Sequence, residues 1–119
     1  MKQLDWLERI FDKQIDRQNQ INGEDSYGEN LTEMYNSATA AMVELGEMLQ
    51  ADTRWKPLIT KSKKAPVYDP DKFLEEWADA FIYMLNVLIY YGAGIEDIKN
   101  AVEHKMLINE ERFNAENKI

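Results

Sequence analysis

The sequence contains no cysteine and a single histidine, His104. The lack of cysteine excludes disulfides, thiolate nucleophiles and cysteine-ligated zinc, and one imidazole cannot build a histidine-rich metal site. Any metal must therefore be held by oxygen. Long apolar runs are also missing, because the most apolar segment, residues 80–91, is shorter than the roughly 20 residues of a membrane span and contains Asn86. We expect no membrane contact.

Basic residues are in the minority, with 14 against 22 acidic residues and a formal net charge of -8. A nucleic-acid surface needs a basic face, so nucleic acid is not an expected partner. The N-terminus lacks the continuous apolar core of a secretory signal, which predicts a cytoplasmic protein. A length of 119 residues predicts one domain spanning residues 1–119.

Apolar residues recur with helical spacing in four segments, and nothing is typical of a strand. Three of the helices are expected at about 2–20, at 31 to about 51, and from 70 to Gly92, where Asn30 and Asp69 are the expected N-caps of the second and third. A fourth begins near Ile95 and carries its apolar stripe to Phe113. The segment between the second and third helices shows no helical period and is expected to be an exposed loop. These patterns predict an all-α fold, a four- to five-helix bundle.

Two acidic pairs stand on the second and third helices. Glu44 and Glu47 form one pair and Glu76 and Asp79 the other, each spaced i, i+3, which places both carboxylates on one helical face. Two such helices can present four acids to one point. Carboxylates at close range raise one another's pKa, and a divalent cation bound by carboxylates and water, Mg²⁺ or Mn²⁺, removes that conflict.

Either pair alone is also typical of a solvated helix face. Glu76 and Asp79, however, begin the most apolar helix, where an acid is costly unless something binds it. Their neighbours there are Phe73, Trp77, Ala80 and Phe81.

The two acidic blocks, MVELGE and LEEWADAFIYMLN, resemble the Glu-x-x-Glu and Glu-x-x-Asp signature of the all-alpha nucleotide pyrophosphohydrolases, which include MazG-like enzymes and dimeric dUTPases. The segments IFDKQ, RWK and HKMLINEER are similar to further segments of the dUTPase branch. The resemblance implies the helical bundle of that superfamily, and hydrolysis of dUTP, with dUDP as a further candidate substrate, to dUMP and pyrophosphate. It also implies a homodimer or higher homo-oligomer.

The resemblance assigns roles to individual residues. Glu44, Glu47, Glu76 and Asp79 would hold two or more Mg²⁺ ions, with Mn²⁺ able to substitute, and either Glu44 or Glu47 would orient or deprotonate the attacking water. Phosphate contacts would come from Lys56, Lys105 and Arg112. Base and sugar contacts would come from Gln14, Trp55, Asn86 and Asn109.

Several of these residues have a structural alternative. Trp55 is either a base-stacking residue or an anchor at the edge of a loop. Asn86 either contacts the sugar or base or bonds between helices, and Gln14 either reads uracil with its amide or bonds to backbone in the core. Gln14 is followed by Ile15 and Asp16 where the dUTPase branch has Leu-Asn. The alternatives to dUTP hydrolysis are therefore a MazG-like or dCTP-type pyrophosphohydrolase and a non-enzymatic helical interaction module.

Overall fold

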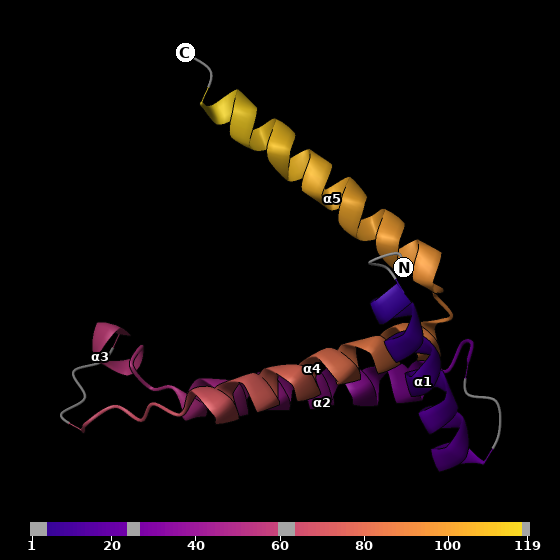
Figure 1. Ribbon diagram of the computed structural model, residues 1–119, viewed down its shortest axis with the longest axis horizontal. Coiled ribbons are helices and arrows are strands. Elements are labelled where there is room, and N and C mark those ends of the chain that lie inside the picture. The colour runs from indigo at the N-terminus through magenta and orange to yellow at the C-terminus, as the bar shows by residue number, and fades with distance from the viewer. Residues whose placement is uncertain (1–4, 24–26, 60–63, 118–119) are drawn as a thin grey trace.

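The computed structural model describes residues 5–23, 27–59 and 64–117. Five helices occur in these ranges, and Figure 1 shows their arrangement: α1 (Asp5–Asn22), α2 (Leu31–Ala51), α3 (Lys56–Ile59), α4 (Pro70–Tyr91) and α5 (Ile95–Glu116). No strand occurs in these ranges, in which one isolated antiparallel bridge joins Asp52 to Tyr68. The predicted all-α class is confirmed.

Helices α2 and α4 lie side by side and run in opposite directions, and they form the central helix pair of the fold (Figure 1). Both begin at the caps that the sequence predicts. The Asn30 side chain accepts a hydrogen bond from the Glu33 amide, and the Asp69 side chain accepts one from the Lys72 amide. These bonds satisfy amides that have no partner inside a helix, so the first turn of each helix is fixed.

The end of α2 is joined to the start of α4 by short backbone contacts. The Thr53 amide donates to the Val67 carbonyl, the Val67 amide donates to Thr53 Oγ1, and the Asp69 amide donates to the Ala51 carbonyl. These bonds join the two helices at the end nearer to the acidic pairs.

Helix α1 crosses the opposite end of this pair and closes the core there. Phe11, Leu85 and Ile89 are buried together. The buried Tyr90 hydroxyl donates to Gln18 Oε1 at 2.6 Å and accepts from Asn22 Nδ2 at 2.9 Å. These bonds satisfy a polar group that would be costly to bury alone.

Helix α5 leaves the body at Gly92, which has φ of 92°, in the left-handed region that favours glycine. The axes of α4 and α5 are bent by 115°, and α5 contains no buried residue. Figure 1 shows it projecting away from α2 and α4. The Cα radius of gyration is 18.2 Å, against about 13 to 14 Å for a compact domain of this length.

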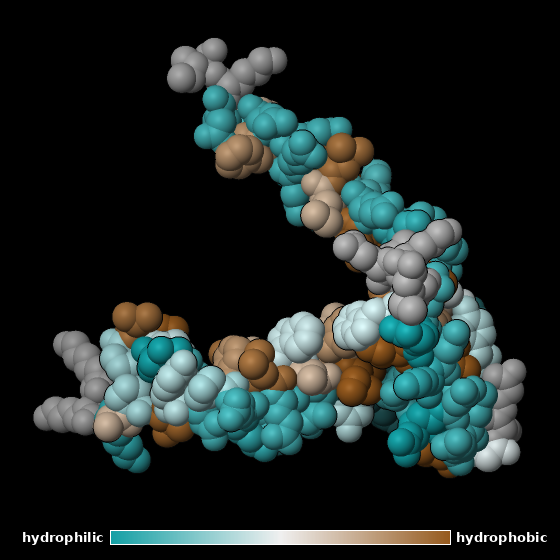
Figure 2. All heavy atoms as spheres, viewed as in Figure 1, coloured by the Kyte–Doolittle hydropathy of each residue, from teal (hydrophilic) through white to brown (hydrophobic). Residues whose placement is uncertain are grey.

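The α2–α4 pair and α5 form the two arms of the molecule. Many large apolar side chains are exposed in the single chain, and Figure 2 shows some of them on the sides of the two arms that face each other. Those on α2, α4 and α5 include Met42, Leu45, Leu74, Trp77, Met84, Val102, Met106 and Phe113. No single helix among the described residues has the length and apolar content to cross a membrane; only α4 and α5 together meet that test, and they are bent at their junction.

The structure differs from the sequence prediction in two places. Residues 56–59, expected in a loop, form the one-turn helix α3. Helix α1 ends at Asn22 rather than about Gln20. Residues 2–4 of the predicted first helix lie outside the described residues. A single turn is too short to show a period, which explains the missed helix.

Candidate metal centre

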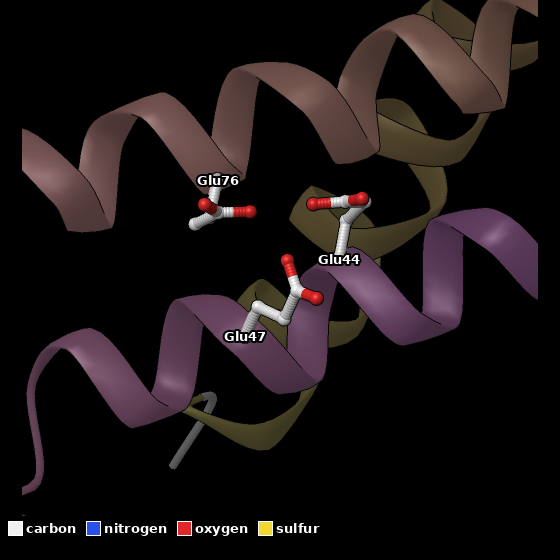
Figure 3. A group of neighbouring side chains, drawn as sticks. All are labelled: Glu44, Glu47 and Glu76. Carbon is white, nitrogen blue, oxygen red and sulfur yellow. The ribbon is translucent and has the colours of Figure 1, made fainter.

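Three of the four predicted ligands meet between α2 and α4. One carboxylate oxygen each of Glu44, Glu47 and Glu76 lies within 4.8 Å of the other two. Figure 3 shows Glu44 and Glu47 rising from α2 toward Glu76, which descends from α4. The i, i+3 spacing of the first two and the antiparallel packing of the helices bring the three carboxylates together.

The group is partly shielded from water. Glu76 is 3% exposed, Glu44 is half-buried and Glu47 is exposed. When both carboxylates are ionised, Glu44 Oε2 and Glu76 Oε2 are buried without a hydrogen-bond partner. Buried polar atoms are nearly always paired, so two unpaired oxygens facing a common point fit a bound cation.

The carboxylates perturb one another's protonation. A hydrogen bond with Glu76, aided by burial and by the charge of Glu47, raises the pKa of Glu44 to about 7. The same bond, together with Lys72, lowers the pKa of Glu76. Without a metal, a proton on Glu44 thus gives the pair the donor that two carboxylates lack.

A lysine that the sequence analysis missed also contacts the group. Lys72 Nζ lies 2.7 Å from Glu76 Oε1, one helical turn away on α4. The signal was present, since a lysine four residues before a glutamate on a helix is a common ion pair.

Beside the acids is an open cleft of about 470 Å³. It is a place where a polar ligand can reach the carboxylates from solvent. Its lining consists of Glu47, Gln50, Ala51, Val67, Asp69, Lys72 and Glu76.

Asp79, the fourth predicted ligand, is half-buried on α4 one turn beyond Glu76 but is not part of the converging group. Its role as a ligand stays a prediction.

Three of the four residues predicted to contact base or sugar, Gln14, Asn86 and Trp55, lie at two different ends of the α2–α4 pair. Near α1, Gln14 Nε2 donates to Asn86 Oδ1 at 2.8 Å, so Asn86 bonds between helices and Gln14 bonds to a side chain rather than to backbone. Near α3, Trp55 Nε1 donates to the Leu49 carbonyl at 2.8 Å, which anchors the indole at the loop edge. Lys56 lies beside it, with Nζ 5.7 Å from the centre of the Trp55 ring.

The remaining predicted residues lie on α5. Lys105, Asn109 and Arg112 are exposed, and the helix that carries them projects away from the acids of the same chain (Figure 1). The structure does not bring them to the candidate centre within one chain.

Comparison with known proteins adds one finding. A family model described as dUTPase matches residues 1–118. No curated protein and no solved structure matches the chain.

Proposed function

Since this chain belongs to the dUTPase family, in its dimeric all-alpha branch, we propose that it hydrolyses dUTP to dUMP and pyrophosphate with Mg²⁺ held by Glu44, Glu47 and Glu76. The family shows dUTP diphosphatase activity. The observation that supports the metal site is the pair of buried oxygens of Glu44 and Glu76 on facing helices, which have no hydrogen-bond partner when both carboxylates are ionised. Asp79, one turn along the same face, is the proposed fourth ligand.

The donor set favours a hard cation. All three converging groups are carboxylates, which suit Mg²⁺ or Mn²⁺, and the adjoining cleft leaves room for phosphate oxygens and water. Two or more bound ions would neutralise charge on the phosphates and acidify a water molecule. We assign the orientation and deprotonation of that water to Glu47, because it is the exposed carboxylate that lines the cleft.

Recognition of uracil is assigned to Gln14 and Asn86. After their mutual hydrogen bond, the pair still offers the Gln14 Oε1 acceptor and the Asn86 amide donor. Uracil presents a donor at N3 beside carbonyl acceptors, so the two amides complement its edge. Relative turnover of dUTP, dUDP, dCTP, dTTP and UTP tests this preference, and equal turnover of all five would contradict it.

We also propose a homodimer, acting in the cytoplasm, in which α5 of one chain reaches the acids of its partner. The apolar residues exposed on α2, α4 and α5 form a surface of the kind that a partner chain buries. On α5, Val102, Met106 and Phe113 follow a helical stripe, and Lys105 and Arg112 lie beside that stripe. A partner packed on the stripe would thus meet the two cations.

The metal site is tested with two neighbouring glutamates. Glu76→Gln removes a buried ligand, and its matched control Glu75→Gln changes an exposed glutamate next to it. We expect Glu76→Gln to abolish Mg²⁺ binding in calorimetry and to lower dUTP turnover about 100-fold or more, while Glu75→Gln behaves as wild type. Unchanged Mg²⁺ binding and turnover in Glu76→Gln would exclude the proposed site.

A further inference from the structure

Lys72 contacts the buried carboxylate Glu76 and also lines the open cleft. Its Nζ lies 2.7 Å from Glu76 Oε1, but the two side chains differ in exposure: 4% for Glu76 and 52% for Lys72. Most i, i+4 pairs on helices are exposed at both ends and contribute little. Here one end is a buried carboxylate of the candidate metal site, so the pair has a consequence beyond helix stability.

The contact supplies a positive charge to a group rich in negative charge. Glu44, Glu47 and Glu76 converge within 4.8 Å. Lys72 contacts one oxygen of Glu76, and the other oxygen has no hydrogen-bond partner when Glu44 and Glu76 are both ionised. An ammonium group beside a carboxylate competes with a divalent cation for it, because like charges at short range repel.

We propose that Lys72 is a movable counter-ion, which holds Glu76 before the metal binds and transfers to a phosphate oxygen of the substrate afterwards. This inference rests on the proposed function, since it assumes a metal at the three glutamates and a nucleotide in the cleft. Lys72 is then a substrate-positioning residue rather than a member of the metal site.

The position of Lys72 allows both states. Its side chain lines the same cleft as Glu47 and Gln50, so it borders the space open to a ligand. The lysine stem is flexible and its charge is a point with three donors, which suits exchange between a carboxylate and a phosphate. A bound cation would repel the ammonium group from Glu76, and the phosphates would offer it a new anionic partner.

The first test measures metal binding without nucleotide. Lys72→Met keeps most of the length of the side chain and removes its charge, and Lys72→Arg keeps the charge. Lys99→Met, on α5, is the matched control for the loss of one positive charge elsewhere. By titration calorimetry we expect Lys72→Met to bind Mg²⁺ roughly ten-fold more tightly than wild type, with Lys72→Arg and Lys99→Met close to wild type.

The second test measures kinetics at saturating Mg²⁺. Loss of the phosphate contact should raise the KM for dUTP about ten-fold in Lys72→Met with little change in kcat, and Lys72→Arg should retain most of the affinity. A Lys72→Met variant that is merely less stable, with wild-type Mg²⁺ affinity and KM, would overturn the inference while leaving the metal site intact. Wild-type protein that binds no Mg²⁺ would instead overturn the proposed function itself.

Discussion

At the scale of single residues, Glu44 should make the stability of the metal-free protein depend on pH. Its pKa is about 7 in the folded chain against an ordinary value of 4.5, so the folded state binds the proton more tightly than the unfolded state. Stability is therefore lost as pH rises from about 4.5 to about 7 and is constant above that range. We expect the melting temperature in EDTA to fall across this interval.

The variant Glu44→Gln separates this effect from other titrations. It removes the proton-binding carboxyl, so its melting temperature in EDTA should not fall between pH 5 and 7 as that of wild type does. Glu76, whose pKa is lowered, acts in the opposite direction and destabilises only as pH falls below 4.5. If the melting temperatures of wild type and Glu44→Gln fell by the same amount between pH 5 and 7, Glu44 would not be the residue with the raised pKa.

The sequence predicted that four carboxylates of two helices meet, and in the structure Glu44, Glu47 and Glu76 converge while Asp79 lies outside the group. It did not predict every contact that these carboxylates make. The i, i+3 spacing fixes the face of Glu44, Glu47 and Glu76, and that is enough once the two helices are known to be adjacent. The ion pair between Lys72 and Glu76 depends on the rotamer of Lys72, which residue spacing does not determine. The Gln14–Asn86 bond was open for the same reason, because a lone buried amide shows a need for a partner without identifying it.

At the scale of helices, two glycines have opposite expected effects when replaced by alanine. Gly92 ends α4 with φ of 92°, so Gly92→Ala should lower the free energy of unfolding by about 1 kcal/mol. Gly46 lies within α2 with no atom within 4 Å of an added Cβ, so Gly46→Ala should raise it by up to about 1 kcal/mol. Denaturant unfolding measures both, and a stabilised Gly92→Ala variant would contradict the cap assignment.

Helix limits were predicted well wherever a cap marks them. Asn30, Asp69 with Pro70, and Gly92 delimit α2 and α4 as expected, because each residue solves a local hydrogen-bond or backbone problem. The direction of α5 was not predictable in the same way. Periodicity shows that a helix has an apolar stripe, but it does not show whether that stripe meets its own chain or another.

At the scale of the whole molecule, a single chain exposes many apolar side chains, and its α5 points away from its own acids. The radius of gyration of 18.2 Å and the exposed apolar side chains of α2, α4 and α5 describe a shape that a second copy would fill. The acids lie on one arm and the cations Lys105 and Arg112 on the other (Figure 1). A symmetric dimer would present the α5 of each chain to the acids of the other.

Complementation tests this arrangement directly. Glu76→Gln damages the acidic part of a site and Arg112→Ala the α5 part, and each homodimer should be nearly inactive. In a heterodimer purified through two different tags, one site would carry both defects and the other would be intact, so activity should return to about half of wild type. The matched control pairs Glu76→Gln with Glu44→Gln, which damage the same part and leave no intact site. If Arg112 served its own chain, every site in both heterodimers would carry one defect, and neither heterodimer would recover activity.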